Sequence, residues 1–147
     1  MREETIKNKI RLLVESQATA VLATAADSQP YASLVGFSYS ADLKKIFFAT
    51  PNNTTKYRNL ADNPNISLII DSRICNQKDF SRSAAITVMG EAHELEGEDR
   101  SQKLADHAAR LPGLAGFFSS PTMAMFQIDV QAYIVADGMT EVAVYHP

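Results

Sequence analysis

The stretch FFATPNNTTKYRNL, residues 47–60, shows where a strand ends and a helix begins in this chain. Its first residues, Phe47 to Thr50, are typical of the end of a buried strand. The polar residues that follow suit a turn and a helix N-cap, where a side-chain oxygen accepts a free backbone N–H. Lys56 and Arg58 then fall in the first helical turn, although the positive end of the helix dipole favours acidic side chains there. No acidic residue follows until Asp62, so this strand–turn–helix unit concentrates positive charge at one end of the fold.

This helix start is a candidate anion site. Free backbone N–H groups, the hydroxyls of Thr54 and Thr55, and two cations without a local counter-charge favour a bound anion, and phosphate is the expected occupant. The alternative is a solvated loop whose cations face water. The neighbouring strand segments, Ser33 to Gly36 and Phe48 to Thr50, are uncharged and contain small residues, which suits a phosphorylated planar ligand.

Length and composition indicate an ordinary globular protein. The chain has 147 residues, of which 46% are hydrophobic and 21% charged, and we expect one domain over residues 1–147. The formal net charge of −3 argues against a nucleic-acid binder driven by overall charge, although it leaves room for a local basic pocket.

The sequence also bears on the compartment. Cys75 is the single cysteine, which excludes an internal disulfide framework and is compatible with a reducing compartment. No apolar run approaches the ~20 residues of a membrane helix. The first residues include acids and lack an apolar signal segment. We therefore expect a cytoplasmic protein with neither a membrane nor a nucleic-acid partner.

The residues before this unit predict one helix and three strands. An apolar stripe of Ile6, Ile10, Leu13 and Val14 predicts an amphipathic helix. The expected elements are a helix over residues 3–16 and strands over 18–25, 31–39 and 45–49. The strand 18–25 has no charge, as expected of a strand covered on both faces. Gly36 inside the second strand indicates a bulge or the close approach of a backbone or ligand.

The residues after it predict further strands joined by turns. The expected elements are a short helix from Lys56 to about Asp62, a strand over 66–70, a polar irregular segment over 71–82, a strand over 84–95 with a bulge at Gly90, a helix over 97–110, a strand region over 123–135 with a kink near Asp129, and a strand over 141–145. The polar segment is either a loop at the edge of a site or interface or a surface loop. The apolar residues Leu114, Phe117 and Phe118 need to be buried, and a partner subunit is a candidate to cover them.

About seven strands connected mostly by turns favour a largely antiparallel sheet that is closed or nearly closed. The fold class expected from the sequence is therefore mainly β (α+β), a small barrel with helices at its ends and edges.

Several kinds of active site lack support in the sequence. His93, His107 and His146 share no motif with a serine, and metal-ligand spacings such as C-x-x-C or H-x-x-x-H are absent, so we expect these histidines to be surface or strand residues and predict no metal site. The dinucleotide-binding and P-loop glycine motifs are also missing. Cys75, near Arg73, is either a reactive thiol or, more simply, an inert thiol in a loop.

The order of motifs resembles a known family. Ala-Thr-Ala-Val-Leu-Ala-Thr, Gln-Pro-Tyr-Ala-Ser-Leu-Val, Ile-Phe-Phe-Ala-Thr, Thr-Thr-Lys-Tyr-Arg-Asn-Leu, Asn-Pro-Asn-Ile-Ser-Leu-Ile-Ile and Val-Met-Gly-Glu-Ala-His-Glu-Leu follow one another with the spacing of the pyridoxamine 5′-phosphate oxidase-like, FMN-binding split-barrel proteins. The resemblance covers nearly the whole chain and is most specific from Thr50 through Ile70. It implies a split β-barrel homodimer with FMN at the subunit interface and a small-molecule substrate.

The resemblance also implies roles for particular residues. Thr54, Thr55 and Lys56 correspond to the residues that hold the FMN phosphate. Residues along the isoalloxazine ring or the ribityl chain are Ser33, Leu34, Val35 and Gly36, with Ala49 and Thr50 at the ring or its polar edge. The candidates that complete the site from the other subunit are Arg73, Asn76 and Gln77.

Departures from the family pattern limit the expected activity. The oxidase has an arginine on the strand where this chain has the uncharged run Ser33 to Ser38, and a C-terminal tryptophan/arginine segment that this chain lacks. Vitamin B6 oxidation is therefore not expected, whereas FMN-dependent hydride or electron transfer to another small molecule is. The segment from His107 to Phe126 also looks like split-barrel proteins linked to haem utilisation. The alternative function is thus a non-catalytic module that binds haem, deazaflavin or flavin, and no catalytic residue is assigned.

Overall fold

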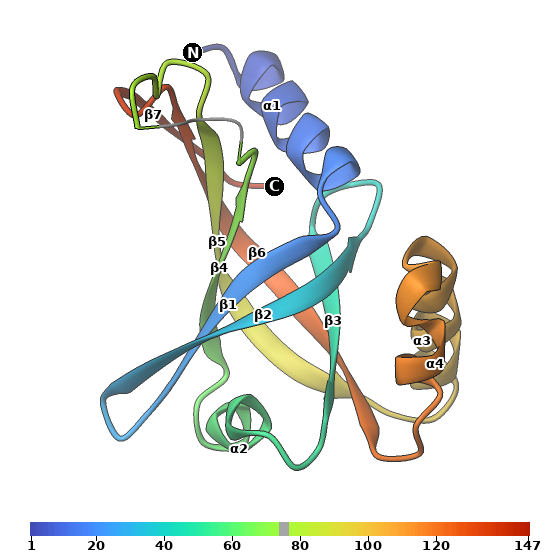
Figure 1. Ribbon diagram of the computed structural model, residues 1–147. Helices are drawn as coiled ribbons and strands as arrows, with labels where there is room; N and C mark the ends of the chain where they lie inside the picture. The colour runs from blue at the N-terminus through green and yellow to red at the C-terminus, as the bar shows by residue number, and fades with distance from the viewer. Residues whose placement is uncertain (74–76) are drawn as a thin grey trace.

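Residues 1–73 and 77–147 are described by a computed structural model of the chain (Figure 1). In chain order the elements are α1 (Glu3–Ser16), β1 (Thr19–Ala26), β2 (Gln29–Tyr39), β3 (Lys45–Pro51), α2 (Thr55–Asp62), β4 (Asn65–Asp71), β5 (Ala84–Leu95), α3 (Gly97–Arg110), the 3₁₀ turn η1 (Pro112–Leu114), α4 (Ala115–Phe118), β6 (Met123–Asp137) and β7 (Glu141–Tyr145). The strands and helices expected from the sequence are all present, with small shifts at their ends. The short helical turns η1 and α4 occupy a segment for which the sequence predicted only a loop.

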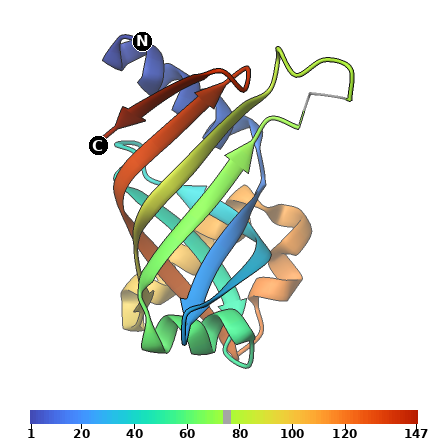
Figure 2. The same cartoon turned by 90° about the vertical axis from the view of Figure 1, so that its left-hand side faces the viewer.

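The strands form an antiparallel barrel. Their order in the sheet is β3-β2-β1-β4-β5-β6-β7, and an additional pairing of β3 with β6 closes the first six strands on themselves. β7 pairs with β6 and extends the sheet outside the barrel. Tight turns explain the antiparallel pairing, as at Asp27 and Ser28, which both have positive φ in the manner of a two-residue hairpin turn. The predicted mainly β fold with flanking helices is confirmed (Figure 2).

The barrel is split at one seam. β2 pairs with β3 over Phe37, Ser38 and Tyr39, whereas the earlier part of β2 pairs with β1 in a hairpin that projects from the barrel (Figure 1). The end of β3 pairs with β6 instead, from Ala49 to Pro51. The two strands therefore diverge, and α2 begins where β3 leaves the seam. This arrangement confirms the split barrel expected from the resemblance.

Alternating side chains fill the barrel, and α1 covers one mouth of it with Ile6, Ile10, Leu13 and Val14. The end of α1 is tied to α3 by Arg110, whose Nη2 donates to the carbonyl oxygens of Val14 at 2.6 Å and Gln17 at 2.9 Å. These carbonyls lie at the negative end of the α1 dipole, so a cation is well placed there.

A second apolar cluster lies outside the barrel, between the sheet and α3. It contains Phe47, Ala49, Leu95, Leu111, Phe118, Met123 and Met125. The outward-facing residues of β3 and β6 in this cluster are apolar because α3 and α4 cover them (Figure 1). Phe118 is buried within its own chain, so it does not need the partner subunit expected from the sequence, whereas Leu114 and Phe117 remain exposed.

Three local expectations are tested by the strands. A β-bulge lies at Gly90, as predicted, and Gln131 is the extra residue on β6, close to the kink expected near Asp129. At Gly36 the explanation is different. β2 pairs with β1 in continuous register up to this residue, so there is no bulge. A Cβ at Gly36 would lie 2.8 Å from Leu111 Cδ1, so the group that approaches the glycine is the side chain of Leu111, just before η1. The expectation that β1 is covered on both faces is wrong for one chain, because its buried and half-buried residues alternate.

Candidate functional site

The turn between β3 and α2 is built by hydroxyl groups. Thr54 is the N-cap of α2: its Oγ1 accepts from the backbone N–H of Tyr57 at 3.3 Å and donates to the Pro51 carbonyl at 3.0 Å. The same oxygen lies 3.0 Å from Thr50 Oγ1, and Thr50 is buried. Thr50 and Thr54 therefore fix the shape of the turn with their side chains. Thr55 and Lys56 come next, at the first positions of the helix.

Lys56 is a half-buried cation at the start of α2. Loss of hydration lowers its pKa below the ordinary value of a lysine. Among the residues that the structure describes, no acid forms an ion pair with it, and the first turn of α2 has no acidic residue. A partly desolvated ammonium group beside free helix N–H groups matches the electrostatics of an anion site.

Arg58 folds back toward the turn that precedes α2. Its Nη2 donates to Thr55 Oγ1 at 3.2 Å, and its Nη1 lies 3.5 Å from the Asn53 carbonyl oxygen. The signal in the sequence is the three-residue spacing between Thr55 and Arg58, which places both side chains on one helix face.

The rest of α2 is anchored to the barrel. The Tyr57 hydroxyl donates to Glu94 Oε1 at 2.7 Å, and the Tyr57 ring packs edge-on against Phe126. Asn59 donates to Thr24 Oγ1 at 3.1 Å in a buried contact with β1. These contacts hold the helix start, with its two cations, at a fixed place beside the seam.

The candidate residues of β2 alternate between the two faces of the strand. Val35 faces the core and is buried, so its side chain is unavailable to a ligand, and Gly36 lies beneath Leu111. Ser33 lies in the part of β2 that leaves β3, and its Oγ is buried without a hydrogen-bond partner in the described part of the chain. Leu34 points outward and is 62% exposed. Leu34 is thus open to a ligand or a partner, whereas Ser33 offers a buried hydroxyl that lacks a hydrogen bond in the described structure.

The candidate residues of β3 and of the polar segment 71–82 are less accessible to a ligand at the seam or lie outside the described residues. The Ala49 side chain packs in the cluster under α3, which leaves its backbone as the group that a ligand can reach. Gln77 is exposed. Asn76 and Cys75 lie outside the described residues.

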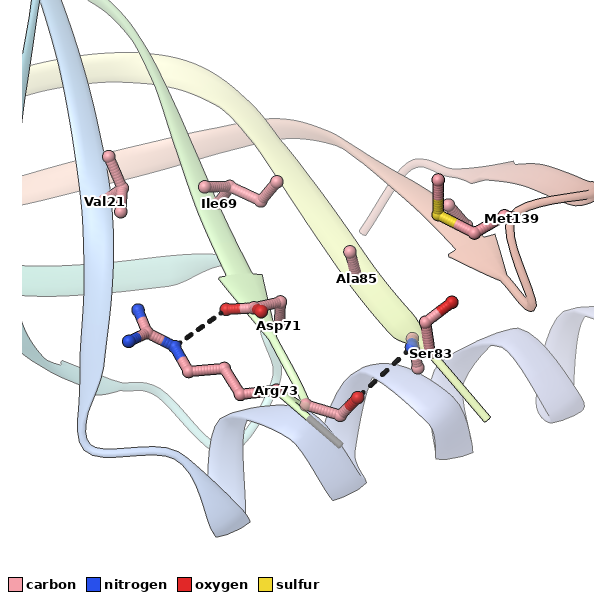
Figure 3. Close-up of a pocket in the computed structure, with 10 residues that line it drawn as sticks. Val21, Ile69, Asp71, Arg73, Ser83, Ala85 and Met139 are labelled. Atoms are coloured by element: carbon pink, nitrogen blue, oxygen red, sulfur yellow. Dashed lines mark hydrogen bonds and ion pairs between the residues drawn. The ribbon is translucent and has the colours of Figure 1, made fainter. Parts of the chain in front are cut away.

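Arg73 lines a different cavity, of about 650 Å³, on the outer face of the sheet. Figure 3 shows its guanidinium turned toward Asp71, where Nε donates to Oδ1 at 3.1 Å. Val21, Ile69 and Met139 give the cavity an apolar wall. Arg73 follows the far end of β4, whereas α2 precedes the near end (Figure 1). Six residue steps along a strand span about 20 Å, so one chain does not bring Arg73 to Lys56.

The cavity belongs to an apolar sheet face. A row of outward-facing residues crosses six strands in register: Leu34, Val21, Ile69, Thr87, Ile134 and Val144. Ile69 is 40% and Val144 53% exposed. Contiguous apolar surfaces of this kind mark interaction sites in soluble proteins. The row begins at Leu34, next to the seam, so the seam and this face share an edge.

His107 differs from the surface histidine expected from the sequence. It is 0% exposed, its Nδ1 lies 2.9 Å from Ser38 Oγ, and its Nε2 has no partner among the described residues. Burial, with a smaller effect of the Arg110 charge, lowers its pKa to about 4. It is a neutral core residue whose ring packs against that of Phe118 at a tilt of 58°, and no sequence signal distinguishes it from an exposed histidine.

Two further properties of the described residues bear on the site. No group of three or more His, Cys, Asp or Glu side chains is placed to hold a metal ion. None of the helices formed by these residues has both the length and the apolar character needed to cross a membrane.

These features define a split-barrel protein with a cationic helix start at its seam. The family model for pyridoxamine 5′-phosphate oxidase matches residues 6–134, and the chain belongs to this family. A comparison with curated protein sequences finds no match.

Solved structures share the fold at low sequence identity. A haem binding protein from Mycobacterium smegmatis is 20% identical with a TM-score of 0.81, over 94% of this chain and 56% of that one. General Stress Protein 26 from Bacillus anthracis is 19% identical with a TM-score of 0.75, over 97% and 98%. An FAD-binding protein from Mesorhizobium loti is 18% identical with a TM-score of 0.68, over 85% and 89%. At these identities the likeness extends to the fold alone.

Proposed function

We propose that this protein is an FMN-binding flavoprotein of the cytoplasm, formed by a single split-barrel domain over residues 1–147. The observation that carries the proposal is Lys56, a half-buried cation at a helix start with no acidic partner among the described residues. A phosphate there supplies the missing negative charge, and Thr55 adds a hydroxyl donor.

The neighbouring strand β2 offers groups suited to the ribityl chain and ring of FMN. Ser33 carries a buried hydroxyl without a partner in the described structure, and a buried polar group of this kind needs a hydrogen bond from somewhere. The ribityl chain of FMN is rich in hydroxyls and is suited to provide one. Leu34, Val35, Gly36, Ala49 and Thr50 then border the ring through side chains or backbone.

We further propose a homodimer. The row from Leu34 to Val144 is apolar apart from Thr87, is exposed at Leu34, Ile69 and Val144 in one chain, and begins at the edge of the seam. Pairing two copies through this face covers it and brings the partner's polar segment toward the seam, so that Arg73, Asn76 and Gln77 can complete the site in trans. This accounts for the separation of Arg73 from Lys56 within one chain.

Bound FMN supplies hydride or electron transfer through its N5, as flavin cofactors do. The chain's own task is to bind and orient: Lys56 and Thr55 hold the phosphate, Ser33 fixes the ribityl chain, and the dimer face excludes water. The vitamin B6 substrate is not proposed, because the run Ser33 to Ser38 has no charge that would hold its phosphate. The substrate proposed is a different small molecule.

The second candidate is a module that captures haem, deazaflavin or flavin without turnover. The haem binding protein that shares this fold makes haem the first ligand to test.

Spectroscopy of the purified protein separates the two candidates. A flavin absorbance band that dithionite bleaches, followed by saturable FMN binding in a fluorescence titration, supports the first. A Soret band after haem addition, with no flavin bound, supports the second and overturns the first. Screening NADH and NADPH oxidation by the FMN-loaded protein then tests for turnover.

A further inference from the structure

The segment after α3 places apolar side chains against β2, beside the proposed flavin site. A Cβ at Gly36 would lie 2.8 Å from Leu111 Cδ1 and 3.5 Å from Leu114 Cδ1, so both leucines lie against the outward face of β2 at this glycine. Leu34 lies two residues before Gly36, on the same face of the strand and about 7 Å away. Because Leu34 and Leu114 are exposed, β2 and η1 border an open apolar surface here.

Phe117 on α4 adds an aromatic ring to this surface. It follows Leu114 by three residues, the spacing that places two side chains on one face of a helical turn. Phe117 is exposed, and its ring centroid lies 5.6 Å from that of the buried Phe118, which packs in the cluster under α3. The exposed ring is therefore held in place by its neighbour. We call Leu34, Leu114 and Phe117 the apolar rim.

The segments that carry the apolar rim contain no charged side chain. Residues 28–41, which include β2, and residues 111–128, which run from the end of α3 into β6, have neither acidic nor basic residues. Arg110 directly precedes the second segment, but its guanidinium donates to three backbone carbonyls of α1 and β2. Arg73, which a partner chain would contribute, already forms an ion pair with Asp71. In the described part of the chain, the rim therefore offers a ligand no unpaired charge.

A surface of this kind selects its ligand by exclusion. Burying a charged group without a partner is far more costly than burying an apolar one, whereas an apolar molecule gains from contact with the rim. We propose that the substrate of the FMN-loaded protein is an uncharged, largely apolar hydride acceptor, and that Leu114 and Phe117 determine this specificity. This inference rests on the proposed FMN function, which places Leu34 and Gly36 at the ring, and adds the class of substrate.

The reaction with such an acceptor is a two-electron transfer. The acceptor takes a hydride from N5 of the reduced flavin and a proton from water, so it is reduced by two electrons while the flavin is oxidised by two. The rim residues take no part in the chemistry. Their task is to hold the acceptor against the ring and to exclude charged competitors.

The test uses two acceptors that differ by one charge, an unsubstituted naphthoquinone and its sulfonate. Stopped-flow absorbance measures how fast each of them reoxidises the dithionite-reduced, FMN-loaded protein. Free reduced FMN is measured with the same pair, so that the intrinsic difference between the two quinones cancels. The wild type is compared with Leu114→Lys and Phe117→Lys. Leu12→Lys, at an exposed leucine of α1, adds the same charge elsewhere and is the matched control.

Relative to free reduced FMN, the wild type should favour the uncharged quinone over the sulfonate by ~10-fold or more, because the sulfonate has to approach an apolar surface without a partner for its charge. Leu114→Lys and Phe117→Lys should lose most of this preference, since each new ammonium group can pair with the sulfonate. Leu12→Lys should keep it. Thermal unfolding confirms that the variants fold, and sedimentation velocity measures their assembly.

Different results would overturn the inference in different ways. If the wild type has no more preference than free FMN, or if both rim variants keep the wild-type preference, the rim does not select the substrate, while the proposed FMN function stands. Dissociation of a dimer in the rim variants but not in Leu12→Lys would instead assign the rim to contact with the partner subunit. If the wild type retains no FMN after desalting, the proposed function fails and the inference fails with it.

Discussion

Replacing Lys56 with methionine should change ligand binding and stability in opposite directions. Methionine keeps the length and apolar stem of lysine but removes its charge. Because Lys56 is half-buried and has no acidic partner in the described structure, its removal leaves no carboxylate unpaired and relieves a desolvated charge. The apo-protein should therefore be unchanged or gain a few tenths of a kcal/mol, the ordinary range for a partly exposed site.

Binding of FMN should become weaker in the same variant. A charge-assisted hydrogen bond contributes about 1.5–3 kcal/mol, which corresponds to a loss of about 10- to 150-fold in affinity. Riboflavin, which has no phosphate, should bind the variant and the wild type alike. Isothermal titration calorimetry at constant ionic strength measures both ligands, and urea unfolding measures the apo-protein.

The control for this experiment is Lys45→Met. Lys45 is exposed at the opposite end of β3, so this change removes the same charge far from the helix start. If Lys56→Met loses no more FMN affinity than the control, the phosphate assignment is wrong. A large loss of stability in the apo-protein would instead show that Lys56 has a structural role that its contacts do not reveal.

Three other predictions concern the fold and the assembly. Ile69→Lys on the apolar face should turn a dimer into a folded monomer in sedimentation velocity, whereas Leu12→Lys, at an exposed position of α1, should not; a dimer in both variants would place the interface elsewhere. Gly36→Ala should lower the free energy of unfolding in urea by about 1–3 kcal/mol, because the new Cβ would lie 2.8 Å from Leu111 Cδ1. An unchanged unfolding midpoint would show that the Leu111 side chain moves aside without cost. His107 stays neutral in the fold down to pH about 4, whereas the unfolded chain takes up the proton near pH 6.5, so stability should fall as the pH decreases between these values, by up to about 3 kcal/mol. His107→Gln should lose that component, and parallel pH profiles for the two proteins would contradict the assignment.

Local sequence signals predicted the elements well, because caps, turns and apolar periodicity are short-range. Thr54 takes the N-cap position that its neighbours suggested, and the bulge at Gly90 follows from a glycine inside a strand. Gly36 also lies inside a strand, but the reason for a glycine at this position is different. The side chain that approaches it comes from Leu111, far along the chain, and no window of sequence contains that contact.

The strand β1 shows a second limit. Its uncharged, small side chains predicted burial on both faces, yet one chain buries only alternate residues. Composition reflects every surface that is covered in the functional assembly, including a face that a second subunit would cover. The candidate site shows the same limit of local sequence signals. Lys56 was identified from its neighbours in the sequence, whereas the position of Arg73 depends on how strands far apart in the chain are arranged.

The pairing of β3 with β6 also has a consequence for biosynthesis. Lys45 pairs with Asp129, so the barrel closes between segments that leave the ribosome far apart in time. Until β6 emerges, the inward-facing residues of the earlier strands have no closed interior to occupy. Contacts of such long sequence separation slow folding and prolong the exposure of apolar strands. A nascent chain that stops before Met123 should therefore be a substrate for chaperones, however stable the finished barrel is.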